Sequence, residues 1–316
     1  MKFKPNIKLL TSKIIFIGGV TRSGKSFLCP IVSSFKNCEM FFMSSFAENI
    51  TYIDNLKGIN KNYSNFLIKL IFNEVIYNMN IGRNLNQRRS DYTSINKYKN
   101  SKIYLKRMKG PEGDTIVKKI KKNKNLYPVM FHDVLINPKL LLGSFKQSKI
   151  IFVDRHPVDL IDEWVRKKYS ADFFANPRNV TLSFDFKGKN YPHWCLKHFR
   201  NISKTKNIYK KTITSLSALI LKQKSVFKKL EKNYKKRIKI IKFDNLINDT
   251  DKEINKISKF VKTKISLHTK KEIEKQGGNR KINKNLREYL KKKILGKIDK
   301  KTKNLLENLE LSYNKD

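Results

Sequence analysis

The sequence predicts an α/β protein with three layers, α/β/α, in which helices cover both faces of a mainly parallel central sheet. Short apolar segments rich in β-branched residues alternate with longer segments whose apolar residues recur at helical spacing. This alternation is typical of parallel strands joined by right-handed helical crossovers. A glycine-rich loop follows the first apolar segment, where a strand would pass into a helix. The expected strands are residues 14–17, 38–43, 127–132, 149–153 and 237–243.

The segments between these strands predict the helices in turn. Residues 27–35 continue from the glycine-rich loop, with Pro30 in the first turns, where proline is tolerated. Residues 157–168 begin with a proline and carry Asp159 nearby, and both features favour a helix start. The other expected helices are a core-facing helix within 46–80 and helices at 133–148, 201–235, 249–262 and 298–311.

We expect one domain over residues 1–316, because no segment rich in Pro, Gly or Ser divides the chain. Two regions, at about 46–125 and 170–200, are expected to be insertions at the strand ends that form a lid or an acceptor-binding region. For the polar residues 81–125, a solvated loop with a short helix is an equally open interpretation.

The chain has a formal net charge of +44, from 70 Lys and Arg against 26 Asp and Glu. A polyanionic partner such as nucleic acid, an anionic glycan or a membrane surface would explain this charge. Codon drift is the favoured explanation, because Lys, Asn and Ile are abundant and the lysines are spread along the whole chain. No helix-turn-helix, zinc-finger or RNP pattern is present, so we expect no specific nucleic-acid partner.

Cys29, Cys38 and Cys195 lack the spacing of a zinc site or a disulfide framework, and we expect no metal site. The first residues contain no long apolar stretch, and no stretch approaches 18 apolar residues. The expectation is therefore a cytoplasmic protein without a transmembrane segment, for which peripheral contact with a membrane surface stays open.

The segment KIIFIGGVTRSGKSFL, residues 13–28, carries the motif on which the functional prediction depends. GGVTRSGKS fits the P-loop pattern G-x-x-x-x-G-K-[ST] in its required strand–loop–helix setting, which predicts a P-loop NTPase-like fold. Glycines let backbone N–H groups point into one concavity, and the helix N-terminus adds a partial positive charge. The expected phosphate or sulfate ligands are Gly19, Arg22, Ser23, Gly24, Lys25, Ser26 and Phe27. The alternative is a glycine-rich turn that binds nothing.

Ligands of parallel sheets lie beyond the carboxyl ends of the strands. The segments there, GGVTRSGKS, FHDVLINPKLLL, KIIFVDRHPVDLIDEW and KIIKFDNLINDTDKEINKISKFV, resemble in this order the sulfotransferase family. That family uses the sulfate donor PAPS and has a P-loop-kinase-like fold. The resemblance covers most of the expected core with few matching residues in each segment. It implies transfer of a sulfuryl group from PAPS to an acceptor hydroxyl or amine, with a carbohydrate as one candidate acceptor.

In that family the first loop has the form G-x-x-R-S-G-[ST]-[ST] and holds the 5′-phosphosulfate. Arg22, Ser23, Gly24 and Ser26 match this form. Lys25 stands where the family has Thr or Ser, which makes the loop more like that of a kinase.

The family's second signature is an Arg at a strand end followed by x-P-x-D, which holds the 3′-phosphate. Arg155, Pro157 and Asp159 match it. A Ser usually follows the Arg by eight residues, and here that position is Glu163. A carboxylate facing a phosphate is unfavourable, so either the helix is shifted locally or the donor differs.

Two further segments extend the resemblance. The family has a [YF]-[ED]-[DN]-L strand end, which residues 243–246 match. GGNRK, residues 277–281, stands where the family has a late basic loop containing glycine. The resemblance therefore implies that Arg280 and Lys281 contact the donor.

The acceptor must lose a proton as the sulfuryl group arrives, and His132 is the candidate base. Histidine titrates near the working pH, and this one lies at an expected strand end. In cytosolic-type sulfotransferases the catalytic histidine occupies a closely similar place. Asp133 is the alternative base, and a hydrogen-bonded core histidine is the non-catalytic interpretation. The resemblance implies that Lys25 and Arg22 neutralise the leaving group.

A P-loop kinase or NTPase that uses ATP and Mg²⁺ is the main alternative. The intact G-K-S favours it, and Asp133 or Asp154 would then hold the metal. It leaves the Arg155-His-Pro157-x-Asp159 element unexplained. A basic protein that binds an anionic polymer is the second alternative, in which a phosphate loop would be superfluous.

Overall fold

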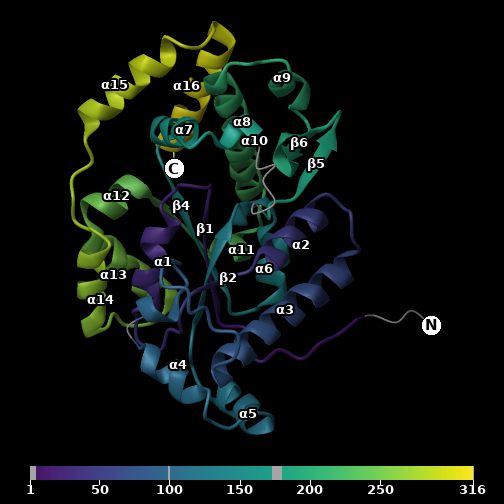
Figure 1. Cartoon of the computed structure of the whole chain (residues 1–316), viewed down its shortest axis with the longest axis vertical. Helices are drawn as coiled ribbons and strands as arrows, with labels where there is room; N and C mark the ends of the chain where they lie inside the picture. Colours follow the sequence, from purple (N-terminus) through teal and green to yellow (C-terminus); the bar gives the residue numbers. More distant parts are fainter. Residues whose placement is uncertain (1–4, 99, 173–179, 316) are drawn as a thin grey trace.

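The computed structural model describes residues 5–98, 100–172 and 180–315 (Figure 1). Its centre is a five-stranded sheet in which all neighbouring strands are parallel. The order across this sheet is β2-β3-β1-β4-β7, so the first strand lies in the middle. The strands are β1 (Ile14–Gly19), β2 (Phe42–Met43), β3 (Tyr127–His132), β4 (Lys149–Asp154) and β7 (Ile238–Lys242), and β5 (Ser183–Phe186) and β6 (Lys189–Pro192) form a separate antiparallel hairpin.

Helices connect these strands and cover both faces of the sheet (Figure 1). They are α1 (Lys25–Ser33), α2 (Ser45–Asn55), α3 (Lys61–Ile81), α4 (Ser101–Arg107), α5 (Asp114–Lys122), α6 (Pro138–Ser144), α7 (Pro157–Arg166), α8 (Tyr169–Asp172), α9 (Phe199–Ser203), α10 (Ile208–Lys228), α11 (Lys232–Lys235), α12 (Phe243–Asn248), α13 (Thr250–Val261), α14 (Leu267–Lys275), α15 (Lys284–Leu295) and α16 (Lys300–Asn314). In the described part of the chain no helix is both long and apolar enough to cross a membrane.

The side chains of β1 divide between two apolar cores. Ile14 and Phe16 pack with α3 and α6 on one face, whereas Ile15 and Ile17 pack with α1, α12 and α13 on the other. Because successive side chains of a strand point to opposite faces, a strand covered on both sides reads as a continuous apolar run. The predicted three-layer α/β/α fold with a parallel sheet is confirmed.

A third apolar core lies among α7, α10, α15, α16 and the hairpin. Trp164 of α7 is fully buried in it, and α10 packs against both α7 and α16. Figure 1 shows α7, α15 and α16 above the upper end of the sheet. This core fixes α7, the helix that follows β4, over the carboxyl ends of the strands.

Several elements differ in extent from the sequence prediction. The strand expected at 38–43 is limited to β2, preceded by an isolated bridge between Cys38 and Leu126. The helix expected at 201–235 begins at Ile208, because the Asn207 side chain accepts from the backbone N–H groups of the first turn. The polar region 81–125 contains α4 and α5, and the region 170–200 contains the hairpin, while residues 173–179 of that expected insertion lie outside the described part.

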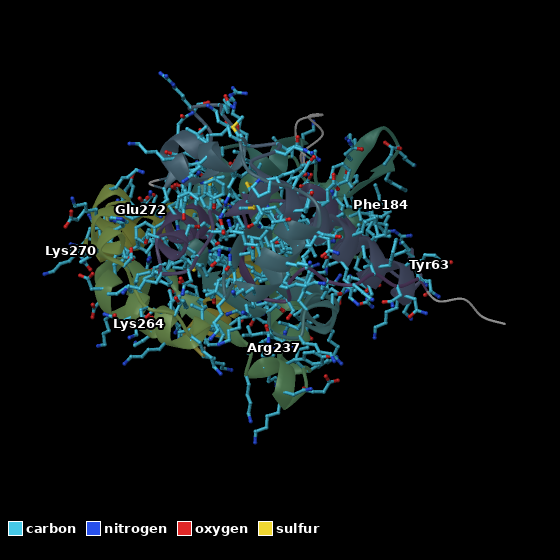
Figure 2. All side chains as sticks on the ribbon, turned by 90° about the horizontal axis from the view of Figure 1, so that it is seen from below. Tyr63, Phe184, Arg237, Lys264, Lys270 and Glu272 are labelled. Carbon is cyan, nitrogen blue, oxygen red and sulfur yellow. The ribbon has the colours of Figure 1, made fainter. Side chains whose placement is uncertain are left out.

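Figure 2 shows the side chains of the molecule from below, the side away from α7, α15 and α16, and labels Arg237 among them. Arg237 precedes β7 there, and its guanidinium donates to the carbonyl oxygens of Leu142, Phe145 and Ser148 at 3.0, 2.6 and 2.9 Å. This charge therefore joins the start of β7 to the end of α6.

Candidate functional site

The P-loop connects β1 to α1 through residues 20–24. Gly24 has φ 107° and Gly19 has φ 151°. A Cβ on Gly24 would lie 2.4 Å from the Phe243 ring, and one on Gly19 would lie 2.5 Å from the Val153 carbonyl oxygen. Glycine is therefore required at both positions by close packing as well as by backbone conformation. Gly24 is also the N-cap of α1 and contributes no side-chain cap, so the N–H groups of the first turn face the loop.

Lys25 is folded back onto the loop. Its side chain is buried, and Nζ donates to the carbonyl oxygens of Gly19 at 2.8 Å and Val20 at 2.9 Å. Burial lowers the pKa of Lys25 to about 8, although the nearby carboxylates of Asp133 and Glu48 oppose this shift. The ammonium group thus contacts carbonyl dipoles, which an anion at the loop can replace without breaking an ion pair.

Two buried donors beside the loop have no hydrogen-bond partner among the described residues. They are Ser23 Oγ and Arg155 Nε. A buried donor without an acceptor is costly, and each such group calls for an explanation. The remaining contacts of Arg155 hold it at the loop: Nη1 donates to the Arg22 carbonyl oxygen at 2.7 Å, and its guanidinium carbon lies 5.2 Å from the centre of the Phe243 ring. An anion with several oxygens fits such a donor set.

Glu163 of α7 faces the same cluster. Arg22 Nε donates to Glu163 Oε2 at 2.9 Å, and Arg166 pairs with the other oxygen. Trp164 Nε1 donates to the Thr21 carbonyl oxygen at 3.0 Å, so α7 is attached to the loop beside this contact. The carboxylate of Glu163 therefore contacts the loop arginine directly, and both interpretations of this departure, a local shift of the helix and a different donor, stay open.

His132 ends β3 and is the parallel partner of Gly19 at the end of β1. Glu48 of α2 accepts from the His132 backbone N–H at 2.7 Å and lies 3.1 Å from the ring nitrogen Nδ1. In the neutral imidazole this contact places the hydrogen on Nδ1 and the lone pair on Nε2, because a carboxylate only accepts. The phenol of Tyr52 donates to the His132 carbonyl oxygen at 3.0 Å. The histidine is thus held from both sides, with 31% of its side chain exposed.

Asp133 follows in a left-handed conformation, φ 48°, and is buried. Gln223 Nε2 donates to its Oδ1 at 3.4 Å. Burial raises the pKa of Asp133 to about 6, although His132 and Lys25 oppose the shift. The second acid of the kinase alternative, Asp154, pairs with Lys224 at 3.1 Å.

Arg287 of α15 joins the second signature to the fourth segment. It donates to both oxygens of Asp159, at 3.0 and 2.7 Å, and to both oxygens of Asp244, at 2.7 and 3.0 Å. Burial opposes its charge, but these hydrogen bonds raise the pKa of Arg287. The start of α7 and the start of α12 are therefore fixed together by one guanidinium.

The remaining predicted ligands lie in two separate places, at the start of α1 and on the loop after α14. Ser26 lies in the first turn of α1, whereas the Phe27 side chain is buried in the apolar core beneath it. Arg280 and Lys281 are exposed on the loop after α14, where the Arg280 N–H donates to the Ile247 carbonyl oxygen at 3.0 Å. These two residues therefore lie beside the end of α12, and their contact with a donor stays a prediction.

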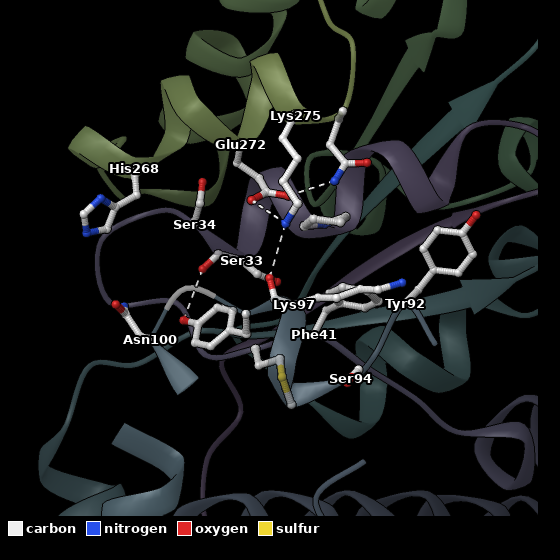
Figure 3. Close-up of a pocket in the computed structure, with 14 residues that line it drawn as sticks. Ser33, Ser34, Phe41, Tyr92, Ser94, Lys97, Asn100, His268, Glu272 and Lys275 are labelled. Atoms are coloured by element: carbon white, nitrogen blue, oxygen red, sulfur yellow. Dashed lines mark hydrogen bonds and ion pairs between the residues drawn. The ribbon is translucent and has the colours of Figure 1, made fainter. Parts of the chain in front are cut away.

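Two hollows flank β2. The hollow in Figure 3, about 200 Å³, is lined by Ser33, Phe41, Tyr92, Tyr98 and Lys275 among others and lies at the end of α1 away from the P-loop. A larger one, about 640 Å³, is lined by Met43 to Phe46 and by residues of α3. The larger hollow thus lies between β2, the start of α2 and α3, and neither His132 nor Glu48 is among the residues that line it.

No family model and no curated protein matches this chain. Solved structures do match, and several of them are sulfotransferases. The sulfotransferase domain of the Synechococcus PCC 7002 olefin synthase covers 98% of this chain and 98% of its own, at 11% identity and a TM-score of 0.45. The sulfotransferase domain from the curacin biosynthetic pathway covers 83% and 77%, at 13% and 0.44. A sulfotransferase from Alicyclobacillus acidocaldarius covers 94% of both chains, at 14% and 0.39.

Sequence reasoning missed Glu48, Tyr52 and Arg287. Glu48 is 84 residues from His132, and its sequence signal, an acidic residue just after the Ser44 cap, indicates only a helix start. Arg287 lies in a Lys-rich segment and carries no motif. Arginine in such a segment is the one available signal, since its fork suits two carboxylates better than a lysine does.

Proposed function

We propose that the protein transfers a sulfuryl group from PAPS to a hydroxyl or amine of an acceptor, of which a carbohydrate is one candidate. One observation carries the proposal: the phosphate loop at the end of β1 adjoins a His–Glu pair at the end of β3, its neighbour in the sheet. A cradle for an anionic leaving group and a base for the acceptor therefore lie at the same edge.

The donor would bind through its 5′-phosphosulfate. Lys25, the unpartnered Ser23 hydroxyl and the N–H groups of the first turn of α1 are the groups suited to its oxygens. Arg155 adds a cation whose Nε has no other acceptor among the described residues. In such a site the protein acts mainly by positioning the reactants and stabilising the developing charge.

The reaction balances with the residues at hand. The acceptor oxygen or nitrogen forms a bond to sulfur, while the bond from sulfur to the 5′-phosphate oxygen breaks. The electron pair of that bond leaves with the phosphate, whose charge Lys25 stabilises. The acceptor proton passes to His132 Nε2, and the products are the sulfated acceptor and PAP. Asp133, next to His132 and close to Lys25, is the alternative base.

Glu48 is a positioning residue in this proposal. Its carboxylate fixes the Nδ1–H tautomer and stabilises the imidazolium that forms when Nε2 takes the proton. Tyr52, whose phenol donates to the His132 carbonyl oxygen, also contacts the region 170–200. Its ring stacks on the His193 ring, with the ring centres 4.1 Å apart. The second insertion thus supports the helix that holds the base.

For the acceptor, the 640 Å³ hollow is a candidate space, since the start of α2, the helix that carries Glu48, lines it. Phe46 at its rim is 76% exposed and Met43 is 47% exposed. Exposed apolar side chains beside a hollow are typical of surfaces that bind a ligand. This supports the expectation that the insertion at 46–125 contributes to an acceptor-binding region.

A kinase that uses ATP and Mg²⁺ is the second candidate, and the observation that favours it is the intact G-K-S with Lys25 at the loop. The two functions differ in the group that moves. We expect the protein to hydrolyse PAPS slowly to PAP and sulfate, and to transfer the label of ³⁵S-PAPS to a panel of sugars, phenols and amines. The His132→Asn variant should lose both activities, and EDTA should leave them intact. Transfer of the γ-phosphate of ATP that EDTA abolishes would contradict the proposal.

A further inference from the structure

The P-loop arginine has a carboxylate partner within the chain. Glu163 Oε2 accepts from Arg22 Nε at 2.9 Å, and the Glu163 side chain is only 13% exposed. Partial burial opposes the charge of this carboxyl, but Arg22, Arg155 and Arg166 hold its pKa below the usual value. Glu163 is therefore ionised at neutral pH and lies among three guanidiniums.

This ion pair is not needed to hold α7 in place. Trp164 is fully buried and donates to the Thr21 carbonyl oxygen, and Arg287 clamps Asp159 in the first turn of the helix. Asp162, one residue before Glu163, also pairs with Arg166, at 3.3 Å, without reaching the loop. The helix thus carries two neighbouring carboxylates, of which Glu163 faces the loop arginine.

The Arg22–Glu163 ion pair affects how a nucleotide can bind when its 5′ group lies in the P-loop. A second phosphate on the ribose would then lie no more than one nucleoside away from the loop, and Arg22 and Arg155 are cations near it. Arg155 Nη1 is bound to the Arg22 carbonyl oxygen, and Arg22 is paired with Glu163. A dianionic phosphate would therefore either displace a carboxylate from its guanidinium or lie beside it, and both outcomes are unfavourable.

We infer that Glu163 acts as an internal counter-anion of Arg22, so that the donor site recognises the 5′-phosphosulfate end of the nucleotide and gains little from a phosphate at the 3′ position. This inference rests on the proposed function and adds to it a specificity-determining residue. It follows that adenosine 5′-phosphosulfate binds nearly as well as PAPS, and that the preference is set by one side chain.

The test uses titration calorimetry with two probes, PAP and adenosine 5′-monophosphate (AMP), on the full chain. The measured quantity is the ratio of the AMP dissociation constant to the PAP dissociation constant. In the wild type we expect a ratio within about 3-fold of unity, because the 3′-phosphate adds little net attraction. Glu163→Gln should raise the ratio by at least about 10-fold, because Arg22 and Arg155 then face the second phosphate without a competing charge.

Asp162→Asn is the matched control, since it removes the same charge one residue away and should leave the ratio within about 3-fold of the wild type. Glu163→Ser serves as a second variant, and the conclusion is drawn from whichever of the two Glu163 variants melts as cooperatively as the wild type. A ratio that rises less than 10-fold in that variant, or rises equally in Asp162→Asn, overturns the inference. Absence of binding of both nucleotides by all variants would instead withdraw the proposed function itself.

Discussion

Lys25 and Arg22 are cations of the same loop, yet the chain neutralises them in different ways. Lys25 contacts two carbonyl dipoles within its own loop, whereas Arg22 contacts the full charge of Glu163 from another helix. Lys25 is buried, and 42% of the Arg22 side chain is exposed. One cation is thus prepared for a ligand, and the other already has an anion.

The difference shows that a positive residue near a phosphate loop is not by itself a phosphate ligand. An ammonium on carbonyl oxygens can exchange them for a stronger acceptor, because charge-assisted hydrogen bonds to an anion are about twice as strong as neutral ones. A guanidinium on a carboxylate exchanges one anion for another and gains far less. The two halves of the site should therefore respond differently to mutation.

The largest effect is expected on the Lys25 side. Lys25→Met should lower kcat/KM for PAPS on the order of 10²–10³-fold, because the developing charge on the leaving phosphate loses its buried cation. Removal of a buried ammonium should not lower the melting temperature, and circular dichroism can check this. A loss of kcat/KM of less than about 10-fold in a folded variant would contradict the different roles assigned to Lys25 and Arg22.

The acceptor side should show a smaller, coupled effect. His132→Asn is expected to lower kcat on the order of 10²-fold, and Glu48→Gln about 10-fold, because the second residue acts through the first. The double variant should be no slower than His132→Asn alone, since positioning has no value without the base. Multiplicative losses in initial-rate measurements would show that Glu48 acts independently.

The pH dependence follows from the buried lysine. Because the pKa of Lys25 is about 8, kcat/KM should fall about tenfold per pH unit well above pH 8, as the ammonium loses its proton. Lys25→Arg should move this limb to higher pH. The folded pKa lies below the unfolded value, so the contribution of Lys25 to stability rises between about pH 8 and 10.5. The difference in unfolding free energy between wild type and Lys25→Met should therefore grow in favour of the wild type there, which separates lost activity from alkaline unfolding.

The smallest effect on activity is expected from Arg287, which joins the start of α7 to the start of α12 and does not contact the P-loop side chains discussed above. Arg287→Gln leaves Asp159 and Asp244 without their shared cation and should lower the free energy of unfolding by about 2 kcal/mol. In this chain that corresponds to roughly 3 °C in the melting temperature. Lys291→Gln, which removes a more exposed ion pair of the same helix, is the control and should cost less than about 1 kcal/mol. Equal shifts in the two variants would show that the clamp adds no stability.

The sequence predicts the part of this account that depends on local patterns. The run from Ile14 to Ile17 and the motif that follows define strand, loop and helix, since both the alternation of faces and the need for glycine are local. The contact of Lys25 with the carbonyl oxygens of its loop cannot be predicted from the motif. The same motif would be present if the lysine side chain were free.

The rest depends on the order of the strands and on which helices meet there. The pairing of Gly19 with His132 requires β3 to neighbour β1, and the contact of Glu48 with His132 requires α2 to return over the end of β3. Glu163 was visible as a departure from a family pattern, but its ion pair with Arg22 depends on how α7 packs. Such contacts across the fold leave no periodicity or spacing in the sequence.

The most direct test of the central claim is a thermal-shift comparison of PAP with ATP–Mg²⁺ on the wild type and on Lys25→Met. We expect PAP, at about 100 times its dissociation constant, to raise the wild-type melting temperature by roughly 4 °C and to leave that of the variant unchanged. A shift with ATP–Mg²⁺ and none with PAP would contradict it.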